Sequence, residues 1–80
     1  MNKELLRSVM ALYGETYSDI ADLLDISYQS VSDKVNESGT EFKQGEIAKI
    51  KARYKLDSDM VDRIFFAGYV SELDASESEG

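Results

Sequence analysis

The chain of 80 residues contains no cysteine, no histidine and no long hydrophobic run. Without cysteine it can form neither a disulfide framework nor a thiolate metal site, which fits a reducing cytosol. Without histidine its serines lack the usual general base, and no glycine-rich phosphate loop or calcium-loop spacing is present. We therefore expect no enzymatic activity, no cofactor and no metal centre.

Membrane and export signals are also missing. No apolar run approaches the roughly 18 residues that a membrane-spanning helix needs. The first ten residues, MNKELLRSVM, lack the small-residue cleavage site of a signal peptide. We expect a cytoplasmic protein with one small domain, because this length leaves no room for a second core.

Positive charge is scarce in this chain. The formal net charge is −7, from 16 acidic and 9 basic residues. Four of the acids and no base fall within residues 64–80, and residues 71–80, SELDASESEG, carry a single leucine. We therefore predict a domain of residues 1–70 followed by a disordered acidic tail of residues 71–80. The remaining excess of acids disfavours non-specific DNA affinity, which comes largely from lysine and arginine on phosphates, and disfavours an anionic membrane as partner.

Apolar residues recur with helical periodicity in five segments, and no strand alternation is present. The predicted helices span about residues 3–13, 17–24, 28–36 and 44–54, and a fifth begins after Asp57 or Ser58. Helices this short are marginal alone, so they must share a core. The predicted fold is an all-α, compact five-helix bundle, with this core: Leu6, Val9, Ile20, Ala21, Leu24, Ile26, Val31, Val35, Ile47, Ile50, Leu56 and Phe65.

Residues 16–36, TYSDIADLLDISYQSVSDKVN, predict two short helices joined by a tight turn. Thr16 is a good N-cap for the first, with Asp19 in a capping-box position, and Ser27 is a good N-cap for the second. Asp25 begins the turn that separates them. This is the layout of a helix-turn-helix, whose second helix can enter a major groove.

These residues resemble the Xre family, the small phage Cro and repressor DNA-binding domains. The resemblance covers about residues 3–67 and implies a repressor-like fold that binds a double-stranded DNA operator as a transcriptional regulator. Asp25 stands at a turn position where the family often has glycine. The pattern that carries the resemblance consists of Thr16, Ile20, Ala21, Leu24, Ile26, Ser27, Val31 and Ser32, followed by Ile47, Ile50, Tyr54, Leu56, Ile64, Phe65 and Phe66.

The outward face of the second helix, residues 28–36, is the candidate reader of bases. Gln29 can form a bidentate contact with adenine, and Asp33 can accept a hydrogen bond from cytosine N4. Ser32 and Asn36 share that face, and Tyr28 at its flank can reach a thymine methyl or a phosphate. A solvated polar face that binds nothing has the same pattern.

Phosphate contacts are expected at the edges of this unit. Tyr17 and Ser18 open the first helix, whose N-terminal amides can bind a phosphate, although Tyr17 also suits a hydrophobic staple. Lys34 and Lys43 flank the second helix, and both equally suit an ordinary surface. The predicted DNA-binding residues are Tyr17, Ser18, Ser27, Tyr28, Gln29, Ser32, Asp33, Lys34, Asn36 and Lys43.

Two features leave the partner open. Phe66, Tyr69 and Val70 suit a homodimer interface, which paired half-sites require, or they pack back on the first helix. Residues 16–42 contain six acids and one base, Lys34. This acidity fits a second function on the same scaffold, an antirepressor-type module that binds a partner phage repressor and blocks its DNA surface. Because Gln29 and its neighbours remain suitable base readers, DNA is the first expectation.

Overall fold

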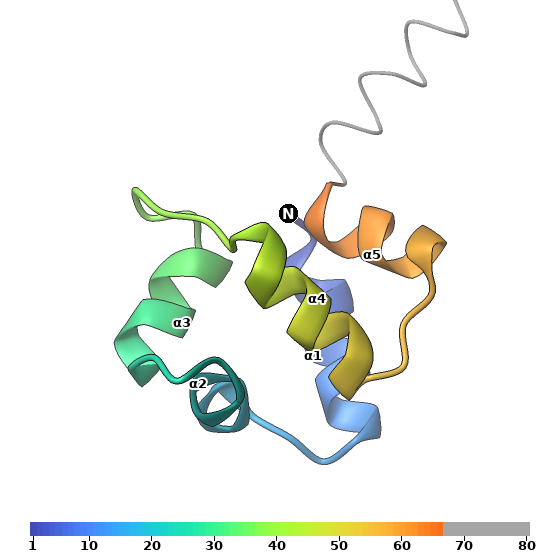
Figure 1. Ribbon diagram of the computed structural model, residues 1–80, viewed down its shortest axis with the longest axis horizontal. Helices are drawn as coiled ribbons and strands as arrows, with labels where there is room; N and C mark the ends of the chain where they lie inside the picture. The colour runs from blue at the N-terminus through green and yellow to red at the C-terminus, as the bar shows by residue number, and fades with distance from the viewer. Residues whose placement is uncertain (67–80) are drawn as a thin grey trace, which may run out of the picture.

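The computed structural model describes residues 1–66, which form five α-helices and no strand (Figure 1). The all-α fold and its five helices are confirmed, and each predicted helix boundary lies within one residue of the observed one. None of the described helices has the length and apolar character that a bilayer crossing requires. The helices are α1 (Lys3–Leu12), α2 (Tyr17–Leu24), α3 (Tyr28–Val35), α4 (Gln44–Arg53) and α5 (Ser58–Phe65).

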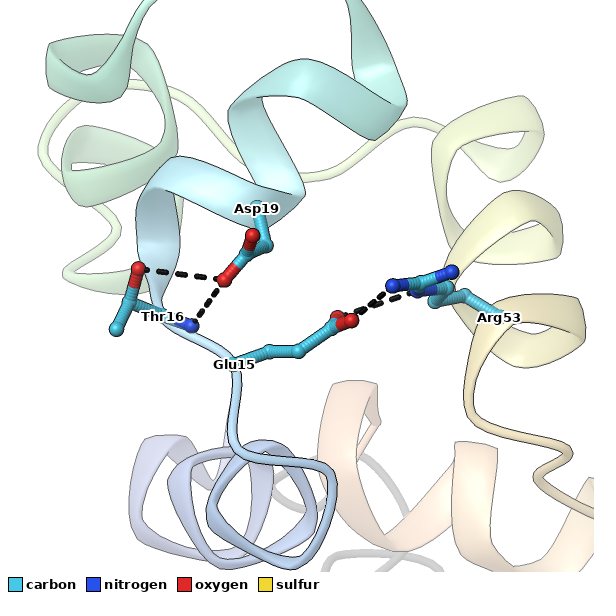
Figure 2. Close-up of polar contacts among 4 residues, drawn as sticks. All are labelled: Glu15, Thr16, Asp19 and Arg53. Carbon is cyan, nitrogen blue, oxygen red and sulfur yellow. Dashed lines mark hydrogen bonds and ion pairs between the residues drawn. The ribbon is translucent and has the colours of Figure 1, made fainter.

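Short polar side chains start most of these helices. The side chains of Asn2, Ser27 and Asp57 each accept a hydrogen bond from the backbone N–H three residues ahead, at 3.0, 3.1 and 2.7 Å. At the start of α2, the backbone N–H of Thr16 donates to Asp19 Oδ2 at 2.8 Å (Figure 2). These bonds satisfy backbone donors that the first helical turn leaves free.

The turn between α2 and α3 needs one residue in the left-handed conformation. Asp25 supplies it, with φ 56° and ψ 47°. Glycine adopts this conformation without strain, and aspartate is one of the few other residues that tolerate it. The N–H of Ile26 then donates to the carbonyl of Ala21 at 3.0 Å and closes the end of α2. Aspartate therefore fills a position where a glycine would be easier, and the turn still forms.

The helices pack around one core. α2 contacts α3 and α4, while α1 contacts α5, which also contacts α4. In Figure 1, α2 and α3 lie on the left, α5 lies on the right, and α4 crosses between them in front of α1. Because α2 and α3 have only eight residues each, their stability depends on this burial rather than on their own hydrogen bonds.

Most of the predicted core is buried, with four corrections. Ile26, Ile47, Leu56 and Phe65 are only half-buried, at the edge of the core. In α5 the central position belongs to Ile64, which is fully buried, because neighbouring residues on a helix point about 100° apart. Phe65 instead meets Phe42 edge-on, with ring centroids 5.6 Å apart. The predicted core residues that are buried are Leu6, Val9, Ile20, Ala21, Leu24, Val31, Val35 and Ile50.

Ala21 lies buried in α2, the helix that packs against both α3 and α4. We expect Ala21→Leu to overpack this position and to lower the free energy of unfolding by about 1–3 kcal/mol. Ala48→Leu is the matched control, because Ala48 is exposed on α4 and should change the same quantity by less than about 0.5 kcal/mol. Urea denaturation measures both. Equal effects of the two variants would contradict the tight packing of Ala21.

Candidate nucleic-acid interface

α3 turns an apolar side inward and a polar side outward. Val31 is fully buried, whereas Gln29 and Asn36 are exposed on the other side of the helix. Ser32 and Asp33 lie half-buried at the edges of that polar side. The outward positions that the periodicity predicted for Gln29 and Asn36 are therefore confirmed, while Ser32 and Asp33 are less accessible than predicted.

The side chains on this face are ordered by contacts with one another. Gln29 Nε2 donates to Asp33 Oδ1 at 2.9 Å, one helical turn away. A glutamine amide carries two N–H groups, so one remains for a ligand beside the carbonyl oxygen. One donor next to one acceptor is the pair that an adenine edge requires. Asp33 thus orients Gln29 rather than standing as an isolated charge.

Ser27 and Ser18 open the two helices of this unit. The Ser27 hydroxyl accepts from the N–H of Ser30 at 3.1 Å and donates to the Ser30 hydroxyl at 2.9 Å, so it serves as the cap of α3. Ser18 is exposed in the first turn of α2. The adjoining Asp19 carboxylate accepts from the Thr16 N–H at 2.8 Å and from its hydroxyl at 3.4 Å (Figure 2). A negative group therefore already lies at the helix end that the sequence assigned to a phosphate.

Lys34 does not lie on the surface where the sequence placed it. Its residue is 7% exposed, and its Nζ lies 3.2 Å from Glu46 Oε1 and 3.3 Å from the carbonyl oxygen of Glu41. Position 34 follows Val31 by three residues, so its stem joins the buried side of α3, and a lysine stem tolerates this when the ammonium finds a partner. Lys34 links α3 to α4, while Lys43 remains exposed at the start of α4.

Two basic residues of α1 that are not among the predicted DNA-binding residues, Lys3 and Arg7, lie beside α3. Arg7 Nε donates to the Tyr17 hydroxyl at 3.0 Å, and this contact raises the pKa of Arg7. The Tyr17 ring lies 6.1 Å from that of Tyr28, which is 56% exposed at the start of α3. Lys3 Nζ lies 3.3 Å from Asn36 Oδ1, at the other end of α3. The spacing of Lys3 and Arg7 was visible in the sequence, but their position along α3 depends on tertiary packing.

A second surface feature lies where the described chain ends. Phe66 is 41% exposed and borders a cavity of about 340 Å³ that Phe42, Ile47 and Phe65 also line. The charged residues at this cavity are Lys34, Glu37, Glu41 and Lys43. Of the predicted dimer residues, Tyr69 and Val70 lie outside the described residues, as does the predicted tail of residues 71–80.

No family model, curated protein or solved structure matches this chain. Across the residues that the structure describes, no three histidine, cysteine, aspartate or glutamate side chains gather as a metal site would need. The candidate interface therefore rests on its own geometry, which is the polar side of α3 with α2 and the basic residues of α1 beside it.

The ion pair between Lys34 and Glu46 predicts a dependence of stability on pH. Burial acts to raise the pKa of Glu46, but the N–H of Lys43 and the Lys34 ammonium outweigh it, so this pKa is lowered from its ordinary value of 4.5. A lowered carboxyl pKa adds stability that is complete above 4.5 and is lost as the pH falls through the native pKa.

We expect Lys34→Gln to lower the free energy of unfolding by about 2 kcal/mol at neutral pH, because Glu46 then lacks its cation. The difference between this variant and the wild type should shrink as the pH falls below 4.5 and Glu46 is protonated. Urea denaturation between neutral pH and about pH 3 measures it. Lys49→Gln, an exposed position on α4, is the control, and the same behaviour in both variants would contradict a structural role for Lys34.

Proposed function

We propose that this protein is a sequence-specific DNA-binding transcriptional regulator of the Cro and repressor type, with α3 as the helix that enters the major groove. The observation that carries the proposal is the pairing of α2 with α3 across a three-residue turn, with Gln29 and Asn36 directed away from the core. A recognition helix must be held this way, anchored on one side and polar on the other. We include a cytoplasmic location in the proposal, because a transcriptional regulator must reach DNA.

Recognition of the DNA bases depends mainly on Gln29. Its amide, oriented by Asp33, offers a donor and an acceptor side by side, which matches N7 and N6 of adenine. Ser32 and Asn36 follow one and two turns along the same helix, and the Asn36 amide donates to the Ser32 hydroxyl at 3.4 Å. Tyr28 supplies an exposed aromatic ring at the start of α3, suited to a thymine methyl or a phosphate.

Operators with two half-sites call for two copies of the chain. The exposed Phe66, beside the apolar cavity lined by Phe42, Ile47 and Phe65, supports pairing of two copies through this end of the molecule. A two-fold contact places the same patch on both subunits, so an apolar patch with both acidic and basic residues at its edge can pair with itself. We include a homodimer in the proposal on this ground.

A second candidate function is an antirepressor-type module that binds a partner repressor through the acidic surface of α2 and α3. The observation that favours it is the burial of Lys34, the one base within residues 16–42. Asp22, Asp25, Glu37 and Glu41 are exposed in the same stretch. Such a surface suits the basic face of a DNA-binding protein, where charges of opposite sign guide association.

If DNA is the partner, Gln29→Ala should weaken binding to the cognate duplex by about 1–3 kcal/mol and relax the preference at one base position. The cognate duplex is obtained by selection from a randomised library with the wild-type protein. Gln44→Ala, an exposed position at the start of α4, is the matched control and should leave the preference unchanged. Fluorescence anisotropy with cognate and random duplexes measures both variants. Equal losses on the two duplexes for Gln29→Ala would exclude it as a base reader.

A further inference from the structure

The proposed interface has no exposed lysine or arginine within its own two helices. Residues 16–42 contain one base, and that base, Lys34, is paired internally with Glu46. At the start of α2 the Asp19 carboxylate accepts from the Thr16 N–H, which already places a negative charge there. Contacts with phosphates supply most of the sequence-independent affinity for DNA and fix the register of the protein on the duplex. Contacts from basic side chains must therefore come from elements outside α2 and α3.

Arg7 differs from the other arginines of the chain. Arg53 is paired with Glu15, and Arg63 with Asp59, whereas within residues 1–66 no carboxylate is paired with Arg7. Its Nε–H is used by the Tyr17 hydroxyl, which leaves the two terminal NH₂ groups of an exposed guanidinium. A guanidinium fixed at one edge presents the fork of donors that binds a phosphate through two hydrogen bonds.

The surroundings of Arg7 form a hollow of about 270 Å³ between α1 and the starts of α2 and α3. Arg7, Thr16, Tyr17 and Tyr28 line it, and the Arg7 guanidinium carbon lies 5.8 Å from the centre of the Tyr17 ring. Glu15 is the one acid that lines the hollow, and it is paired with Arg53 (Figure 2). The hollow thus combines an unpaired cation with aromatic walls, next to the exposed start of α3.

We infer that Arg7, fixed by Tyr17 in this hollow, binds a phosphate of the DNA backbone and thereby positions α3 in the groove. Lys3, one turn earlier on α1, contacts a second phosphate near Asn36 at the other end of α3. Lys3 contacts Asn36 at the end of α3, and Arg7 contacts Tyr17, whose ring lies beside Tyr28 at the start of α3, so the two cations lie toward opposite ends of the reading helix. This inference rests on the DNA-binding function proposed above and adds the element that supplies the backbone contacts.

The test uses Arg7→Gln, which removes the charge and keeps a donor within reach of the Tyr17 hydroxyl. Affinities for cognate and random duplexes are measured by fluorescence anisotropy over a series of salt concentrations. We expect the same fold-loss on both duplexes, and a slope of log K against log salt that is smaller by about 0.9. Arg63→Gln on α5 is the matched control for the lost charge and should keep the wild-type slope.

Two further variants separate a phosphate contact from a purely structural role. Arg7→Lys keeps the charge without the fork, so it should bind more weakly and keep the wild-type slope. Tyr17→Phe frees the guanidinium without removing its charge, and should likewise weaken binding to both duplexes at an unchanged slope. Thermal melting followed by circular dichroism establishes whether each variant is folded. If Arg7→Gln is not folded, the comparison of Arg7→Lys and Tyr17→Phe with the wild type serves as the test.

The outcomes distinguish this inference from the function on which it rests. If Gln29→Ala loses its base preference while Arg7→Gln keeps the wild-type slope and affinity, the phosphate role of Arg7 is wrong and the DNA-binding function stands. Wild-type affinity in folded Arg7→Lys and Tyr17→Phe would also overturn that role. If the wild-type protein binds neither duplex, the inference and the proposed function both fail.

Discussion

The ion pair between Lys34 and Glu46 fixes how α3 lies on the rest of the bundle. α3 has eight residues, too few to be stable by its own hydrogen bonds, and its buried side offers only Val31 and Val35 as large apolar groups. The Lys34 stem adds to that buried side, and its ammonium reaches α4 and the carbonyl of Glu41. Removing either partner would strand a charge with little access to water, which is why such pairs hold helices in one orientation.

The same ion pair determines the charge of the candidate interface. Once Lys34 is internal, the exposed part of residues 16–42 carries acids and no lysine or arginine. Under the proposed function, base reading and phosphate binding fall to different helices, Gln29 on α3 for the first and Arg7 on α1 for the second. If DNA is the partner, the acids that remain weaken non-specific affinity, so specific contacts contribute a larger share of the total affinity.

Local features of the fold were predictable from the sequence, and long-range ones were not. Helix boundaries follow from apolar spacing and from caps such as Ser27 and Asp57, all of which act within a few residues. The burial of Lys34 was not predictable, because its partner Glu46 lies twelve residues away and a lysine stem suits both surface and interior. The choice of Ile64 over Phe65 in the core depends on the rotation of α5 against α1 and α4.

In the candidate site, too, local features were predictable from the sequence and long-range ones were not. The outward direction of Gln29 and Asn36 follows from the helical repeat once Val31 is inside. The pairing of Asp33 with Gln29 requires only a spacing of four residues, so the sequence contained that signal. The contact of Asp19 with the Thr16 N–H follows from the capping-box spacing, so the sequence contained that signal too. The position of Arg7 beside Tyr17 depends instead on tertiary packing, which brings α1 next to the start of α2.

The most direct test of DNA as the partner is a titration of wild-type protein and an Asp33→Asn, Glu37→Gln double variant with random-sequence duplex DNA at two salt concentrations. Both acids lie on α3 or directly after it. Asparagine at position 33 can still accept from Gln29, and glutamine at position 37 can still accept from the N-terminal ammonium, which pairs with Glu37 in the wild type. If α3 enters DNA, removing two negative charges should tighten non-specific binding about five- to tenfold at low salt, and less at high salt.

An Asp59→Asn, Asp62→Asn double variant on α5 makes the same change in net charge away from α3, and should tighten binding less. Undetectable DNA binding by every one of these proteins, together with a loss of affinity for a repressor DNA-binding domain in the α3 double variant at low salt, would contradict the DNA-binding role and favour the antirepressor function.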